Sequence, residues 1–184
     1  LLKFDNRGSS TLSQQLAKNL FNTRGKKYDG LLSKVPKVRT VIIKTKEWLT
    51  AIKIERAYTK REIITMYLNT VDFGSNAYGI KVAAKTFFNT TPDSLTIPQA
   101  AMLVGVLKAP TQYSPVFNPE RALNRRNTVL EQMEKYDYIT EEQLEGFKKQ
   151  SIGLNYQVEN HNKGLATYFR SVINNYLLKW CEEH

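Results

Sequence analysis

The chain has 184 residues, of which 41% are hydrophobic, 11% aromatic and 24% charged, and these values exclude a disordered or collagen-like protein. One cysteine, Cys181, excludes an internal disulfide framework, and two histidines near the C-terminus argue against a histidine-based metal or nucleophile site. The formal net charge is +10, and residues 1–61 hold the whole excess, with 15 basic and 4 acidic side chains. Such a field attracts phosphates, nucleic acid or an anionic membrane surface, unless it is only a solvated basic face.

The spacing of apolar residues predicts helices along nearly the whole chain. Ser9 or Ser10 is expected to cap a first helix that carries Leu12, Leu16, Leu20 and Phe21. Residues 22–37 contain two glycines, a proline and five basic residues, which predicts a mobile basic loop. A long amphipathic helix is expected from about residue 38 to residue 58.

Capping sequences predict where the later helices begin. Thr59 and Thr96 are each followed three residues later by Glu62 or Gln99, which is the spacing of a capping box. The other expected helices are residues 77–88, a helix opened by Asn118-Pro119 that runs to about Lys135, and a short helix capped by Thr140.

The C-terminal part is expected to be a polar connector, residues 151–163, followed by a last helix from about Leu165. That helix carries one apolar stripe, which we expect to meet a neighbouring domain: Leu165, Tyr168, Phe169, Val172, Ile173, Tyr176, Leu177 and Trp180. No strand, repeat or run of 18 apolar residues is apparent, so the predicted fold class is all-α. Because the sequence opens without Met, we interpret it as a fragment of a longer protein.

Two groups of polar residues could carry chemistry. Hydroxyl, amide and lysine side chains crowd the start of the first helix, which is either an anion site or an ordinary polar helix face: Ser10, Thr11, Ser13, Gln14, Gln15 and Lys18. The long helix carries Glu47 among the cations Arg39, Lys44 and Lys46. These cations would keep the Glu47 carboxylate ionised; alternatively, the group is a surface ion pair that contributes little to stability.

Two other features have simple structural interpretations. Residues 67–69 (YLN) are expected to end a helix, and Phe73-Gly74 to close the loop that follows. Arg121, Arg125 and Arg126 are predicted to form a solvated basic face on one helix.

The order of these motifs is more specific than any one of them. Residues 8–21, GSSTLSQQLAKNLF, closely resemble the GGSTITQQLAKNLF motif of the family 51 glycosyltransferases, the peptidoglycan glycosyltransferase domains of class A penicillin-binding proteins. Residues 44–63 are similar to the RKxxE block of that family, and residues 67–84 to its YLN, FG, YGI and AA stretch. With the last motif, at residues 95–133, the resemblance covers roughly residues 6–145.

The resemblance implies a lysozyme-like glycosyltransferase domain over residues 1–150, followed at 151–184 by a connector and a linker helix leading toward a transpeptidase domain. It implies that lipid II is polymerised into glycan strands by inverting transfer, with release of undecaprenyl pyrophosphate, at the periplasmic face of the bacterial inner membrane. Glu47 falls on the second glutamate of the site, which helps place the pyrophosphate or a divalent ion. The substrate-binding positions are Thr11, Gln14, Gln15, Lys18, Arg39, Lys44 and Asn69.

The sequence departs from the family at one decisive point. The family motif EDxxFxxHxG, which supplies the general-base glutamate, has no counterpart in these residues, so we expect the 184-residue chain by itself to be inactive. Smaller departures are Ser9 in place of a glycine, Ile43 in place of an arginine and Gln99 in place of a glutamate. No metal ligand is assigned and no cofactor is required, with a divalent cation such as Mg²⁺ left open. The expected partners are lipid II, the growing glycan strand, the membrane surface and moenomycin-type inhibitors, but not nucleic acid.

Three other functions remain alternatives. A lysozyme-like peptidoglycan hydrolase would share the fold, but it needs a glutamate of raised pKa and a polysaccharide groove. A helical nucleic-acid-binding module is suggested by the positive charge alone. The chain could also be a folded scaffold piece without chemistry of its own.

Overall fold

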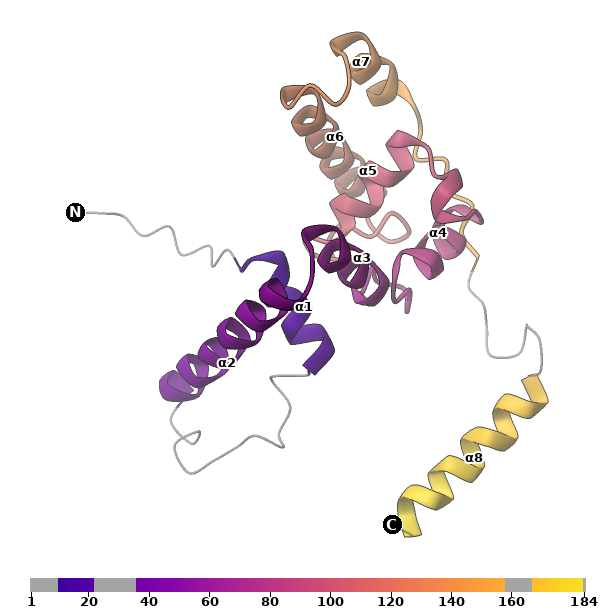
Figure 1. Ribbon diagram of the computed structural model, residues 1–184. Coiled ribbons are helices and arrows are strands. Elements are labelled where there is room, and N and C mark those ends of the chain that lie inside the picture. The colour runs from indigo at the N-terminus through magenta and orange to yellow at the C-terminus, as the bar shows by residue number, and fades with distance from the viewer. Residues whose placement is uncertain (1–9, 22–35, 158–166, 184) are drawn as a thin grey trace.

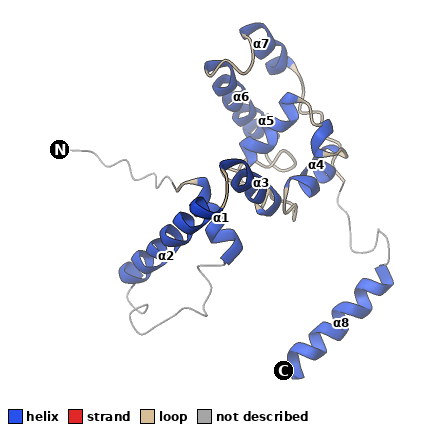
Figure 2. Cartoon of the chain, viewed as in Figure 1, coloured by secondary structure: helices blue, strands red, loops and turns tan. Residues whose placement is uncertain are grey.

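The computed structural model describes residues 10–21, 36–157 and 167–183, and Figure 1 follows the chain through them. The helices in chain order are α1 (Leu12–Phe21), α2 (Pro36–Ala57), α3 (Lys60–Thr70), α4 (Ile80–Phe88), the 3₁₀ turn η3 (Pro92–Ser94), α5 (Ile97–Val106), α6 (Pro119–Lys135), α7 (Glu141–Lys149) and α8 (Thr167–Glu183). Within these ranges there is no strand (Figure 2), and one isolated antiparallel bridge joins Asp72 to Tyr78. The all-α prediction is confirmed.

Three helices begin at capping boxes, as the sequence predicts. Thr59, Thr96 and Thr140 each accept a hydrogen bond from the backbone N–H three residues later, and the side chain at that position accepts one in return. In the first box, hydrogen bonds from the backbone and side chain of Thr59 lower the pKa of the exposed Glu62 carboxyl. The other two boxes have the neutral Gln99 and Gln143 in place of glutamate.

Two predicted helix starts need correction. Thr11 caps α1, because its Oγ1 accepts from the backbone N–H of Gln14 at 3.3 Å, whereas the Ser10 hydroxyl is used elsewhere; Ser9 lies outside the described residues. Helix α4 begins at Ile80 and not at residue 77. Residues 77–79 are not helical, because Tyr78 forms a bridge to Asp72 and Gly79 has φ of +83°.

The main core lies where α1, α2 and α3 meet the helices that follow them. Leu16 and Ala17 of α1 are fully buried, and they belong to the same apolar cluster as Ile54 of α2, Tyr67 of α3 and Phe87 of α4. A second cluster joins α5, α6 and the α7 region: Ala101, Leu130, Ile139 and Leu144. The first cluster therefore ties the helix that carries the predicted polar residues to the rest of the fold.

Two glycines permit close approach of backbone segments. Gly79, with φ of +83°, precedes α4, and a Cβ there would lie 2.6 Å from the carbonyl oxygen of Asn69. Gly105 lies in α5, and a Cβ there would lie 3.1 Å from Cγ of Arg125 in α6. No larger residue fits at position 79 without moving the end of α3, because the obstructing atoms are backbone.

The prediction that Arg121, Arg125 and Arg126 form a solvated face is wrong for Arg126. This side chain is 1% exposed and lies between the buried Ala122 and Leu130, one helical turn to either side. Its Nη1 donates to the carbonyl oxygens of Gln150 (2.8 Å) and Ser151 (3.3 Å), and its Nη2 to those of residues 147 and 148 (both 3.2 Å).

The guanidinium of Arg126 thus donates to carbonyls in the last turn of α7 and just beyond its end. A cation at this helix end is also favoured by the helix dipole. Burial lowers the pKa of Arg126 from its ordinary value, but a guanidinium remains charged.

The described half of the predicted polar connector packs onto the fold. The backbone N–H groups of Asn155 and Gln157 donate to the carbonyls of Phe87 and Thr86, and the Tyr156 ring stacks on Phe87 with centroids 6.1 Å apart. Residues 158–163 and Leu165 lie outside the described residues. In α8, the described apolar side chains of the predicted stripe are exposed: Val172, Ile173, Tyr176, Leu177 and Trp180.

None of the described helices is both long enough and apolar enough to cross a bilayer.

Candidate functional site

The predicted polar residues gather where the start of α1 meets the middle of α2. The centre is Glu47, whose side chain is 2% exposed and whose Oε2 lies 2.7 Å from Nζ of Lys44. Lys44 is one turn earlier on α2, and its side chain is 47% exposed. The interpretation as a surface ion pair is therefore wrong, because one partner is buried and the other reaches from it to solvent.

Lys44 also connects α2 to the segment before α1. Its Nζ donates to Oγ of Ser10 at 3.2 Å, across 34 residues of sequence. The ammonium has three N–H donors, and two of them point to defined acceptors, one a carboxylate and one a hydroxyl. A lysine held in this way keeps its charge at one place, whereas an ordinary surface lysine moves among many rotamers.

Gln15 extends this set of contacts to α3. Its Nε2 donates to the carbonyl oxygen of Ser10 at 3.2 Å, and its Oε1 accepts from the hydroxyl of Tyr67 at 3.1 Å. Tyr67 is 5% exposed, and burial raises the pKa of its hydroxyl, so that it remains a donor at neutral pH. The sequence patterns predict neither the contact of Ser10 with Lys44 nor the contact of Tyr67 with Gln15. The only available signal was their place inside the GSST and YLN stretches.

The remaining predicted site residues lie on α1, α2 and α3 or directly beside them. Thr11, Gln14 and Lys18 belong to the first two turns of α1 or to its cap, and Thr11 and Lys18 are exposed. Asn69 lies in the last turn of α3, where its backbone contacts Gly79, and its side chain is exposed. Arg39 is within α2, but its side chain lies outside the described part. The structure thus brings Gln15, Lys44 and Glu47 into one hydrogen-bonded set and leaves Thr11, Lys18 and Asn69 exposed outside it.

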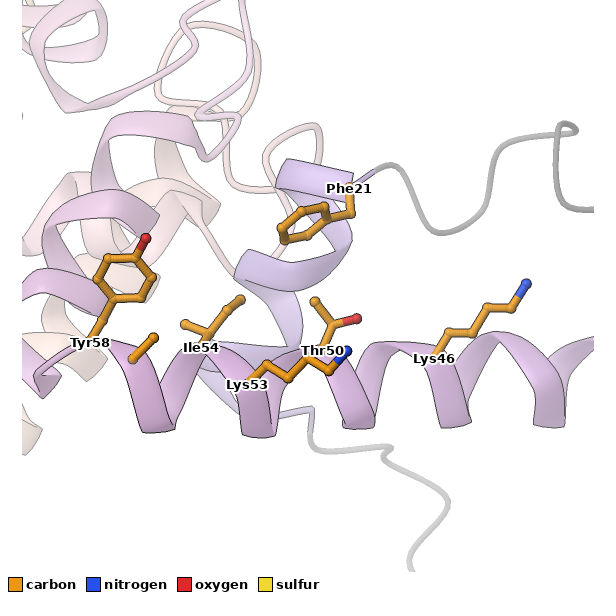
Figure 3. A pocket seen from close by; sticks show the side chains of 7 residues that line it. Phe21, Lys46, Thr50, Lys53, Ile54 and Tyr58 are labelled. Carbon is orange, nitrogen blue, oxygen red and sulfur yellow. The ribbon is translucent and has the colours of Figure 1, made fainter.

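A hollow lies between α1 and α2. It has a volume of about 490 Å³, and it lies between Phe21 at the end of α1 and the face of α2 that carries Thr50 and Ile54 (Figure 3). Lys46 and Lys53 border it from α2, as Figure 3 also shows. None of the described predicted site residues lines this hollow, which is therefore separate from the pair formed by Lys44 and Glu47.

Among the described residues, no three His, Cys, Asp or Glu side chains group closely enough to hold an ion. Glu47 is a single carboxylate with an ammonium already at 2.7 Å. The arrangement is suited to fixing positive charge near the N-terminal end of a helix, where anions are favoured.

Comparisons with known proteins give the class of this fold and site. The family profile described as Transglycosylase matches residues 2–134. The chain belongs to the transglycosylase family, as the sequence motifs predict.

The relatives of the chain are penicillin-binding proteins. It is 41% identical over 171 residues to penicillin-binding protein 1A of Aquifex aeolicus (strain VF5), covering 92% of this chain and 21% of that protein. It is 38% identical over 149 residues to penicillin-binding protein 1A of Escherichia coli (strain K12), covering 81% of this chain and 16% of that protein. The chain therefore spans about a fifth of the length of these relatives.

A solved structure agrees with the fold. The crystal structure of penicillin-binding protein 1A from Haemophilus influenzae superimposes with a TM-score of 0.54 at 29% sequence identity, covering 67% of this chain and 18% of that one. The predicted fold class and family are confirmed.

Proposed function

We propose that these residues form the donor-substrate site of a peptidoglycan glycosyltransferase, which polymerises lipid II into glycan strands. The observation that carries the proposal is the Lys44 ammonium, held between the buried Glu47 carboxylate and the Ser10 hydroxyl at the start of α1. In the proposed reaction, the 4-hydroxyl of the acceptor attacks the anomeric carbon of the growing chain. Undecaprenyl pyrophosphate leaves with inversion at that carbon.

The departing pyrophosphate accumulates negative charge, so the site must supply fixed cations and N–H donors. Lys44 meets that need because its position is set by two acceptors on different segments. Lys18 on α1 and Arg39 on α2 are proposed to add charge to the same anion. The basic first third of the sequence supports this arrangement, since it also raises the local concentration of an anionic substrate.

The other predicted residues have supporting roles in the proposal. Thr11, Gln14 and Gln15 provide hydroxyl and amide groups at the start of α1, and Asn69 provides an amide at the end of α3. Glu47 holds Lys44 and keeps it oriented. We assign no general base among these residues, and we propose that the 184 residues alone do not polymerise lipid II.

The proposal needs no cofactor. If a divalent cation such as Mg²⁺ takes part, Glu47 is the side chain that would contact it, with pyrophosphate oxygens and water supplying the other ligands. The expected setting is the outer face of the bacterial inner membrane, where the growing glycan strand and moenomycin-type inhibitors are further partners. We propose residues 1–150 as the glycosyltransferase domain and 151–184 as the connector toward a following domain.

The test measures binding of a fluorescent lipid II analogue in detergent to the folded chain, with Lys44→Ala and Lys149→Ala beside it. We expect saturable binding that Lys44→Ala weakens at least about tenfold, equal to about 1.4 kcal/mol. Lys149 is exposed on α7, away from the site, and serves as the matched lysine control. Equal binding by all three proteins would contradict the proposal, and release of muropeptides from purified cell wall would instead support a hydrolase.

A further inference from the structure

Tyr67 is a buried tyrosine whose hydroxyl contacts a residue 52 positions away. Its ring belongs to the main apolar cluster, and its hydroxyl donates to Oε1 of Gln15 at 3.1 Å. An apolar ring would fill the same space, so packing alone does not require the hydroxyl. The hydroxyl is therefore the part of Tyr67 that needs a separate explanation.

The contact with Tyr67 holds the Gln15 amide in place. The amide NH₂ donates to the backbone carbonyl of Ser10 at 3.2 Å, and a flipped amide would set its oxygen against that carbonyl, so the orientation follows from Ser10. The oxygen at the other end of the amide then accepts from the Tyr67 hydroxyl. Tyr67 thus restrains the Gln15 side chain in the orientation that bonds Ser10.

Ser10 links the Gln15 amide to the Lys44 ammonium, the cation of the proposed site. Its carbonyl accepts from Gln15, while its Oγ accepts from Nζ of Lys44 at 3.2 Å. The second acceptor of Lys44, Glu47, is on the same helix as Lys44 and cannot by itself fix the distance between α2 and the start of α1. The hydrogen bond to Ser10 joins Lys44 to the segment before α1, and Ser10 is held in turn by Gln15.

We infer that Tyr67 is a positioning residue, which through Gln15 and Ser10 sets where the Lys44 ammonium meets a pyrophosphate-bearing ligand. The inference rests on the proposed function for the identity of that ligand. Tyr67 itself, being buried, does not touch the ligand, and its effect is transmitted along hydrogen bonds that join α3, α1 and α2.

The first arm of the test needs no ligand. Hydrogen exchange of the Gln14 and Gln15 backbone amides is compared between the wild-type chain, Tyr67→Phe and Tyr58→Phe. We expect Tyr67→Phe to speed exchange about fivefold, which is the effect of losing one hydrogen bond that holds a helix start. Tyr58, at the end of α2 and half exposed, is the matched control and should leave the exchange unchanged.

The second arm measures the affinity of the phosphoglycolipid moenomycin for wild type, Tyr67→Phe, Lys44→Ala and the double variant. We expect Tyr67→Phe to weaken binding about fivefold in the wild-type background and to have no further effect once Lys44 is absent. A merely structural role would instead lower affinity equally in both backgrounds, which would overturn the inference.

The two arms separate the inference from the function on which it rests. If wild type binds moenomycin and Tyr67→Phe changes neither exchange nor affinity, the inference is wrong and the proposed function stands. If wild type does not bind, the proposed function fails. The exchange arm then decides alone whether Tyr67 holds the start of α1.

Discussion

Glu47 lies buried beneath Lys44, and 2.7 Å separates its Oε2 from the lysine Nζ, which extends from the protein interior to solvent. The pair is asymmetric, because only the lysine can meet a ligand from outside. Removing the lysine leaves a buried carboxylate that has lost a charge partner, whereas removing the acid leaves a lysine that water can solvate.

Lys44→Met is therefore expected to destabilise the fold more than Glu47→Gln. Methionine keeps most of the side-chain volume but leaves the Glu47 carboxylate without its ammonium, at a cost of about 1–3 kcal/mol. Chemical denaturation of both single variants and the double variant measures this order. The double variant should be more stable than Lys44→Met alone, and strict additivity would show that the pair is not coupled.

Replacement of Arg126 should destabilise the α6–α7 hairpin. Arg126→Met retains the apolar stem between Ala122 and Leu130 but removes the donors to four backbone carbonyls, and we expect a loss of about 2–4 kcal/mol. The matched control is Arg121→Met, an exposed arginine of the same helix, which should change stability by less than about 0.5 kcal/mol. Similar losses in the two variants would refute the capping role.

Gly79→Ala should destabilise the fold for two reasons. Alanine disfavours the positive φ of this position, and its Cβ would lie only 2.6 Å from the backbone oxygen of Asn69. We expect a loss of at least about 2 kcal/mol in the free energy of unfolding. Gly146→Ala is the control: a Cβ there meets nothing within 4 Å, and alanine in helix α7 should stabilise by about 0.5–1 kcal/mol. A tolerated Gly79→Ala would mean that the end of α3 can move.

The two capping boxes of α3 and α7 should respond differently to acid. The folded-state pKa of Glu62 is lowered, so its contribution is present above the ordinary value of 4.5 and is lost as the pH falls through the folded-state value. The cost of Thr59→Ala, read as the difference in thermal midpoint from wild type, should therefore shrink between neutral pH and about pH 3.

Thr140→Ala provides the internal comparison, because its box contains the neutral Gln143. Its cost should stay constant over the same pH range. If both costs shrink together, the acid dependence belongs to the whole protein and not to Glu62.

Much of the fold could be predicted because its signals are local. The threonines at positions 59, 96 and 140 mark helix starts through hydrogen bonds that span only three residues. The i to i+3 spacing of Lys44 and Glu47 likewise predicted their contact. The spacing did not predict that Glu47 is buried, because its burial depends on how α1 and α3 pack over α2.

The features that sequence reasoning missed depend on contacts between distant segments. Arg126 was read as a surface residue because it neighbours other arginines, although its place in line with Ala122 and Leu130 was a signal of burial. Tyr67 was read as part of a helix stop, because nothing local predicts a hydroxyl contact with Gln15. The bridge from Tyr78 to Asp72 and the positive φ of Gly79 similarly place the start of α4 later than predicted.

The most direct test of a preformed pyrophosphate site is a calorimetric titration of the folded chain with moenomycin, alongside Lys18→Ala and Lys44→Ala. The account predicts saturable binding by the wild-type chain, which either substitution weakens at least about tenfold, or about 1.4 kcal/mol. Failure of a well-folded wild-type chain to bind, or equal binding by all three proteins, would contradict it.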